Sequence, residues 1–131
     1  MGIALLDSSI VIGALNRDDA IHEAASQAVR VERDRHSLAI SALTYAEILV
    51  GPLRVGGDAV EVVDRFAAQL RIIDLSPDIA RLAAELRAAR GLKLPDAVIV
   101  ATGLRIGADV IVTADARWQG IEKVTVVDGL G

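Results

Sequence analysis

Short apolar runs alternate with longer amphipathic stretches along this chain of 131 residues. Short runs of mostly aliphatic residues are typical of strands buried on both faces of a parallel sheet. Five such runs are expected to form strands, at residues 3–6, 38–40, 71–75, 110–113 and 123–127. Between them, apolar residues recur at the spacing of helices. This β-α alternation predicts an α/β fold with a parallel sheet of four or five strands and helices on both faces.

Capping residues and helix breakers set the expected helix ends. Ser8 or Ser9 is expected to cap the first helix, and Asp18 or Asp19 the second. The pair Gly51-Pro52 is expected to end the third helix, because proline lacks an amide donor and clashes with the preceding turn. Later helices are expected at residues 58–70, 77–90 and 94–104. The last of these is apolar on nearly every side, which predicts that it is buried between other elements.

The composition indicates a soluble protein with an aliphatic core. Hydrophobic residues make up 53% of the chain but aromatic residues only 2%, so aliphatic side chains must fill the interior. The length suits a single domain spanning residues 1–131. The N-terminus lacks the pattern of a signal peptide, and no apolar run approaches the roughly 18 residues that span a bilayer. We therefore expect a cytoplasmic protein without a membrane segment.

The chain contains no cysteine and only two histidines, which limits the metal sites it can form. Disulfides and thiolate zinc sites are excluded, and a histidine cage would need more imidazoles. Any bound metal must therefore be held mainly by oxygen ligands, which favours Mg²⁺ or Mn²⁺. The formal net charge of −4 equals the charge of four carboxylates, which two divalent ions would neutralise. Net charge therefore leaves a nucleic-acid partner open.

Four acidic residues are expected at one edge of the predicted sheet: Asp7, Glu47, Asp96 and Asp115. Each is expected at or just beyond the end of a predicted strand, and this carboxyl edge is where ligands bind in open α/β sheets. Each acid alone has an ordinary explanation as a helix cap, a first-turn acid or a surface residue. Gathered together, however, four carboxylates would repel one another strongly unless cations lie among them. The set therefore predicts a site for one or two divalent ions.

Such a site is suited to the hydrolysis of phosphodiester bonds. Magnesium usually keeps several waters, so a few carboxylates and the substrate complete its coordination. Two ions about 4 Å apart activate a water and stabilise the leaving oxygen. The hydroxyls of Ser9 and Thr113 are expected to orient these carboxylates or waters. The sequence therefore predicts a hydrolase that needs no covalent nucleophile.

Four segments that contain these acids resemble the motifs of PIN-domain ribonucleases, in the order and roughly the spacing of that family. They are LDSS (6–9), TYAEI (44–48), LPDAVIVAT (94–102) and TADARW (113–118). The length of the chain is similar to that of VapC-type toxins in this family. Ser9 stands where many members carry asparagine. Trp118 is expected to pack over its loop instead of stacking on a base.

The resemblance implies a PIN-like three-layer α/β/α fold with strand order 3-2-1-4-5. It also implies a Mg²⁺- or Mn²⁺-dependent endoribonuclease that cuts structured RNA, such as transfer or ribosomal RNA, by attack of metal-activated water, leaving a 5′-phosphate and a 3′-hydroxyl. The residues that it assigns are the catalytic and metal-binding acids Asp7, Glu47, Asp96 and Asp115 and the supporting hydroxyls of Ser9 and Thr113. Further implications are a homodimer and a VapB-like antitoxin that blocks the site.

Three other classes of protein are alternatives for a chain of this kind. A receiver-type signalling domain would need a second acid at the end of the first strand and a lysine after the fifth strand. Here Asp18 and Asp19 come too late, and Lys93 precedes a helix. A metal-binding module that acts only through protein partners, without catalysis, stays open. A dinucleotide-binding module is disfavoured because no glycine-rich turn follows Leu6.

Overall fold

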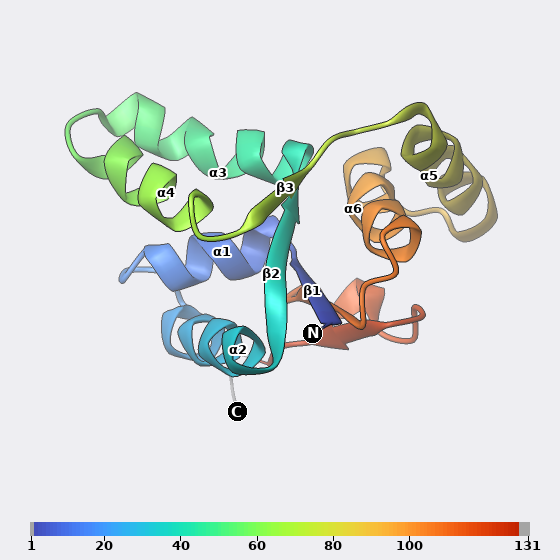
Figure 1. Ribbon diagram of the computed structural model, residues 1–131, viewed down its shortest axis with the longest axis horizontal. Helices are drawn as coiled ribbons and strands as arrows, with labels where there is room; N and C mark the ends of the chain where they lie inside the picture. Colours follow the sequence, from blue (N-terminus) through green and yellow to red (C-terminus); the bar gives the residue numbers. More distant parts are fainter. Residues whose placement is uncertain (1, 129–131) are drawn as a thin grey trace.

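A parallel sheet of five strands forms the centre of the computed structural model, which describes residues 2–128 (Figure 1). The strands are β1 (Gly2–Leu6), β2 (His36–Ser41), β3 (Arg71–Ile73), β4 (Val110–Thr113) and β5 (Val124–Val126). Their order across the sheet is β3-β2-β1-β4-β5, and each neighbouring pair is parallel. The predicted α/β fold and strand order are therefore confirmed, although β3 ends two residues earlier than expected.

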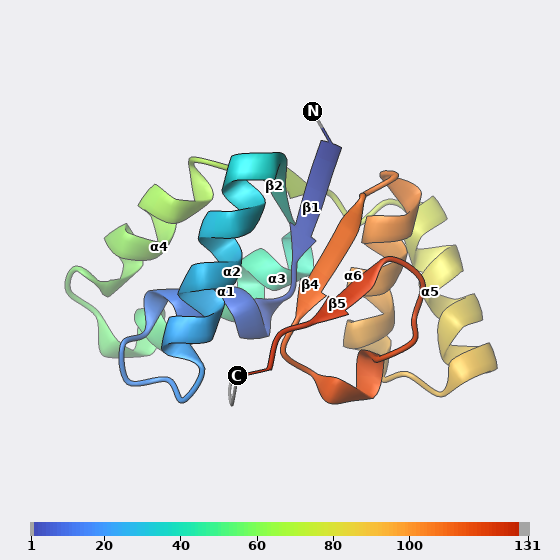
Figure 2. The same cartoon turned by 90° about the horizontal axis from the view of Figure 1, so that it is seen from below.

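The helices cover both faces of the sheet. They are α1 (Ser8–Leu15), α2 (His22–Arg35), α3 (Ala42–Val55), α4 (Ala59–Ala67), α5 (Pro77–Arg90) and α6 (Leu94–Arg105), with a 3-10 turn η1 (Ala116–Trp118). Helices α1–α4 lie on one side of the sheet and α5 and α6 on the other, which gives three layers (Figure 1 and Figure 2). None of the helices among residues 2–128 has the length and apolar character needed to cross a membrane.

The central strand β1 is buried on both faces, as its apolar sequence predicts. Ala4 and Leu6 pack in the cluster that includes Ile10 of α1, whereas Leu5 packs in the cluster that includes Ile99 of α6. All of these β1 side chains are fully buried. Burial of an aliphatic side chain of this size stabilises the fold by about 1.5–3 kcal/mol, so β1 fixes both helical layers to the sheet.

Helix α6 is buried along most of its length, as its sequence predicts, and Gly103 lets it lie close to the sheet. A Cβ atom at Gly103 would lie 2.5 Å from Cδ1 of Ile111 on β4 and 2.6 Å from its Cγ1. Ile111 is itself fully buried, so little space is available for it to move. The absence of a side chain at this position therefore sets the distance between α6 and β4.

Two helix caps differ from those expected. Asp7 caps α1, with its Oδ1 accepting a hydrogen bond from the Ser8 amide, so neither serine is the cap. Helix α2 begins only at His22 and has no side-chain cap, because the Asp19 carboxylate accepts from the Ile21 amide in the preceding turn. In both cases a carboxylate satisfies a nearby amide in a turn, which competes with the expected cap.

The prediction that Gly51-Pro52 ends the third helix is wrong, because α3 continues to Val55. Proline disfavours a helical residue before it through contact with that residue's Cβ, and Gly51 has none. The ring still removes one backbone hydrogen bond and crowds the preceding turn, so the glycine lowers the steric penalty without removing it. The helix ends instead at Gly56, whose positive φ of 80° suits glycine and whose amide donates to the Pro52 carbonyl.

Candidate active site

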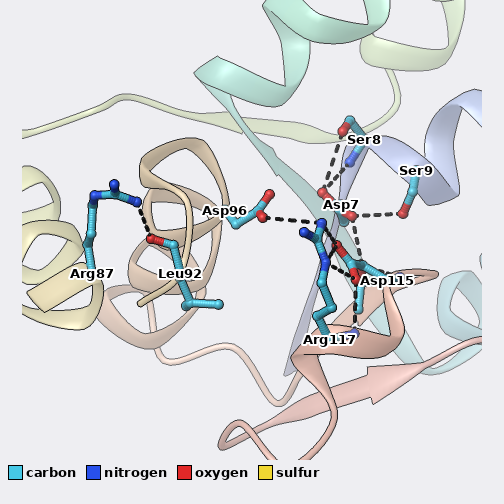
Figure 3. A network of polar contacts seen from close by, with 9 residues as sticks. Asp7, Ser8, Ser9, Arg87, Leu92, Asp96, Asp115 and Arg117 are labelled. Atoms are coloured by element: carbon cyan, nitrogen blue, oxygen red, sulfur yellow. Dashed lines mark hydrogen bonds and ion pairs between the residues drawn. The ribbon is translucent and has the colours of Figure 1, made fainter. Parts of the chain in front are cut away.

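The predicted acids come together at the carboxyl edge of the sheet. Asp7 follows β1, Asp115 follows β4, and Glu47 lies in α3, which starts where β2 ends. Asp96 lies in the first turn of α6, as the helix predicted at 94–104 implies, and so does not follow a strand as the other part of the expectation held. The other end of α6 leads into the start of β4, so its first turn points to the same edge as the strand ends. Figure 3 shows the side chains of Asp7, Asp96 and Asp115 gathered near that of Arg117.

Asp7 is the most buried of these acids, with 5% of its surface exposed. Its Oδ1 accepts from the Ser8 amide at 2.8 Å, and its Oδ2 accepts from the hydroxyls of Ser9 and Thr113, each at 2.7 Å. Its own amide donates to the carbonyl of Val112 on β4 at 2.9 Å. Donors to a carboxylate compensate for the loss of water around its charge. Asp7 is therefore a fixed, desolvated carboxylate.

The two hydroxyls that bind Asp7 also hold the chain after β4. Ser9 Oγ accepts from the Ala114 amide at 3.1 Å, and Thr113 Oγ1 accepts from the Asp115 amide at 3.0 Å. This arrangement follows from the register of the sheet, in which Leu6 of β1 is paired with Val112 of β4. The residues after these partners, Asp7 and Thr113, consequently meet. Both hydroxyls thus connect the Asp7 carboxylate to the loop after β4 that carries Asp115.

Glu47 carries an unsatisfied oxygen at this edge. Its Oε1 is buried and has no hydrogen-bond partner among the described residues. Burial raises the pKa of Glu47 above its ordinary value, and the charges of Asp7 and Asp96 raise it further, while the Ser8 hydroxyl lowers it. A buried polar atom without a protein partner is uncommon in folded proteins and is a place where a water or a bound ion is expected.

Asp96 shares this electrostatic environment. Burial raises its pKa above the ordinary value, and the charges of Asp7 and Asp115 raise it further. The positive charge of the Arg117 guanidinium opposes this rise in the pKa of Asp96. Trp118 is fully buried, which confirms that it packs within its loop. The carboxylates are therefore close enough to disfavour one another's ionisation.

Asp115 is neutralised differently from the other acids. Its two oxygens accept from Nε of Arg117 at 3.0 and 3.1 Å, and Oδ2 accepts from Nη2 at 2.6 Å. This bidentate pair lowers the pKa of Asp115 and raises that of Arg117. The same Nη2 lies 4.0 Å from Oδ2 of Asp96. Arg117 and the Ser8 amide were not assigned by sequence reasoning, because a turn residue after an acid and a backbone donor have no distinctive pattern.

The chemistry of the site fits a hard divalent cation. All four acids, Asp7, Glu47, Asp96 and Asp115, offer oxygen ligands, one of which is buried without a partner. A cation among them would also relieve the repulsion that raises the pKa of Glu47 and Asp96. Within residues 2–128, however, no three acidic or histidine side chains are already arranged as a metal site.

Strand order excludes the receiver-type alternative. In doubly wound receiver domains the order is 2-1-3-4-5, which places the first strand between the second and third. Here β1 lies between β2 and β4. The receiver interpretation is therefore wrong, although an acid does follow the first strand in both architectures.

The fold and the acidic edge define a PIN-like α/β domain, and comparison with protein families agrees. Residues 4–124 match the family described as the PIN domain. The chain belongs to the PIN-domain family, as the four motifs predicted. Comparison with curated proteins gave no match.

Solved structures of toxin–antitoxin systems share this fold. A toxin-antitoxin complex from Klebsiella pneumoniae matches with a TM-score of 0.81 at 30% identity, over 94% of this chain and 96% of that chain. VapBC from Rickettsia felis, bound to a promoter DNA fragment, matches with a TM-score of 0.78 at 20% identity, over 96% and 99% of the two chains. A VapC toxin from Mycobacterium tuberculosis that cleaves the sarcin–ricin loop matches with a TM-score of 0.72 at 18% identity, over 95% and 99%. The resemblance to VapC-type toxins is confirmed.

Replacing Thr113 by valine tests the hydroxyl that joins Asp7 to the β4 loop. We expect Thr113→Val to lower the free energy of unfolding by about 1–3 kcal/mol, because Asp7 loses a donor and the Asp115 amide loses an acceptor. The matched control is Thr102→Val, since Thr102 is also buried but donates only to Val98 within its own helix. Urea denaturation measures both, and equal losses would contradict the proposed network.

The raised pKa of Glu47 predicts a pH dependence of stability in the absence of metal. Because the folded chain holds this proton more tightly than the unfolded chain, ionisation of Glu47 lowers stability as pH rises above its ordinary pKa of 4.5. In buffer with EDTA, Glu47→Gln should therefore become increasingly more stable than wild type from roughly pH 4 to pH 7. Denaturant midpoints measure this gap, and Glu85→Gln on the exposed side of α5 controls for loss of a surface charge. A difference in stability between Glu47→Gln and wild type that stays constant with pH would contradict the expectation.

Proposed function

We propose that this chain is a Mg²⁺- or Mn²⁺-dependent endoribonuclease and the toxin of a VapBC-type toxin–antitoxin pair. The observation that carries the proposal is the group of four acids at one sheet edge of a PIN domain, with the Glu47 Oε1 atom buried and unpaired. The resemblance to a Klebsiella pneumoniae toxin-antitoxin complex supports the toxin assignment. We further propose that residues 1–131 form a single PIN domain that acts in the cytoplasm.

In this proposal the residues that hold one or two ions are Asp7, Glu47, Asp96 and Asp115. A bound ion would supply Lewis acidity and a water of lowered pKa for attack on a phosphodiester. The protein contributes rigid placement, because Ser9 and Thr113 fix the orientation of the Asp7 carboxylate. Preorganised ligands of this kind lower the cost of reorganisation during the reaction.

We propose structured RNA, such as transfer or ribosomal RNA, as the substrate, cut to leave a 5′-phosphate and a 3′-hydroxyl. The Mycobacterium tuberculosis toxin of the same fold, which cleaves the sarcin–ricin loop, makes a folded RNA a reasonable first substrate. Proteins recognise folded RNA largely by shape and by contacts to its backbone.

We also propose that a VapB-like antitoxin covers an apolar groove beside the acids. The groove lies between α1, α3 and α4 and is lined by residues that include Ile12, Leu15, Glu47, Pro52, Val55 and Val62. Val55 is 80% exposed and Val62 is 42% exposed. Exposed apolar side chains that line one groove are typical of a protein-binding surface. Because Glu47 lines the same groove, a protein bound there would lie next to the acids. A homodimer is proposed from the family resemblance alone.

Cleavage of structured RNA tests the nuclease proposal. We expect EDTA to abolish cleavage and added Mg²⁺ or Mn²⁺ to restore it, with mapped ends that carry a 5′-phosphate. Asp7→Asn and Asp96→Asn should each lower kcat/KM by about 100-fold or more, since each removes a charged ligand. Asp78→Asn, in the first turn of α5, should leave the rate unchanged. Cleavage that survives EDTA or both active-site substitutions would overturn the mechanism, and no cleavage at all would favour a module without catalysis.

Substitutions in the groove test the antitoxin proposal. The chain would be co-expressed with a candidate VapB-like protein, and both co-purification and inhibition of cleavage would be measured. Val55→Asp places a charge in the groove and should weaken inhibition by about 10-fold or more, because apolar anchors dominate such interfaces. Val50→Asp is a matched control, since Val50 is exposed on the same helix but does not line the groove. Equal inhibition of both variants would show that the groove is not the binding surface.

A further inference from the structure

Arg117 is positioned as a cation between two of the acids. Its guanidinium holds both oxygens of Asp115, and its Nη2 atom lies 4.0 Å from Oδ2 of Asp96 (Figure 3). The side chain is 64% exposed, so it reaches this position from solvent and not from the core. The η1 turn favours the contact, since the Arg117 amide also donates to Asp115 Oδ1 at 2.9 Å. A single residue thus neutralises one acid and approaches a second.

The chain contains a second cation near these acids that makes a useful comparison. Lys93 precedes α6 and lowers the pKa of Asp115 through its charge alone. Among the described residues, the ion pairs to Asp96 and Asp115 come from Arg117. Lys93 therefore contributes positive charge to the site without occupying the space between the acids.

We infer that Arg117 is the resident counter-cation of the metal-free site and that a divalent ion must displace its guanidinium from Asp96 and Asp115 in order to bind. The inference rests on the proposed metal-dependent function. A guanidinium and a divalent ion held by the same carboxylates would repel each other, because both are positive and only a few ångströms would separate them.

Competition of this kind lowers the apparent affinity for metal. The site exists in two arrangements, one with Arg117 on the acids and one with the acids free for the ion, and metal binds only the second. The apparent dissociation constant is therefore raised by the small fraction of molecules in which the acids are free. Removal of the guanidinium should tighten metal binding while making the metal-free protein less stable.

The experiment compares wild type, Arg117→Gln and Lys93→Gln in Mn²⁺ titrations of the full chain. Binding is measured by calorimetry and by fluorescence of Trp118, the one tryptophan in the sequence, which lies in the same η1 turn as Arg117. Arg117→Gln should bind Mn²⁺ roughly 5- to 100-fold more tightly than wild type. Lys93→Gln should change the affinity for Mn²⁺ much less, because Lys93 carries the same charge but does not lie between Asp96 and Asp115.

Thermal unfolding gives a second measurement that does not depend on activity. In EDTA, Arg117→Gln should unfold at a lower temperature than wild type, since Asp96 and Asp115 lose their counter-cation. At saturating Mn²⁺ this deficit should disappear, because the ion performs the same neutralisation in both proteins. A residue that only braced the η1 turn would give a deficit that persists with metal.

The possible results separate the inference from the proposed function. Equal or weaker Mn²⁺ binding by Arg117→Gln, or an equal gain for Lys93→Gln, overturns displacement while leaving a metal-dependent nuclease in place. An absence of Mn²⁺ binding in wild type and in both variants overturns the metal site itself and the inference with it. Tighter binding confined to Arg117→Gln, together with loss of its stability deficit in Mn²⁺, supports displacement.

Discussion

Repulsion among carboxylates gathered at one edge is the constraint on which this structure depends. The protein meets it in three ways. Asp7 is buried but receives donors from a backbone amide and two hydroxyls. Glu47 and Asp96 stay easier to protonate, as their raised pKa values show, and Asp115 is paired with Arg117. These arrangements reduce the repulsion among the acids, and a divalent cation bound between them would reduce it further.

Topology explains why acids so distant in sequence share one location. Parallel strands bring all of their carboxyl ends to the same edge, which accounts for Asp7 and Asp115. The register of β1 against β4 then places Thr113 beside Asp7. Helix α6 runs back toward the start of β4, so its first turn brings Asp96 to the same edge from the opposite layer. Function in this fold follows from strand direction and register as much as from the acids themselves.

Patterns of apolar residues were sufficient to predict the strands and the α/β class, because strands buried on both faces leave a continuous aliphatic run. The strand order came from the family resemblance, since periodicity carries no information on lateral neighbours. The positions of the acids were predictable because each lies in a motif. The role of Arg117 was not, because an ion pair within a turn depends on backbone conformation that sequence spacing does not encode. Gly51-Pro52 misled because a glycine before proline lacks the Cβ atom that the ring would contact, which lowers the steric penalty of continuing the helix.

The close contact at Gly103 connects the position of helix α6 on the sheet to the position of Asp96 in the site. Gly103 is the point at which the helix rests on Ile111 of β4, and Asp96 lies seven residues away, an arm of about 10 Å along the helix axis. A small tilt of α6 at Gly103 would move the Asp96 carboxylate, because the two helical turns between these residues are stiff. Evolution or a protein engineer could therefore tune the spacing of the acids from the hydrophobic interior, without altering any residue that touches the substrate.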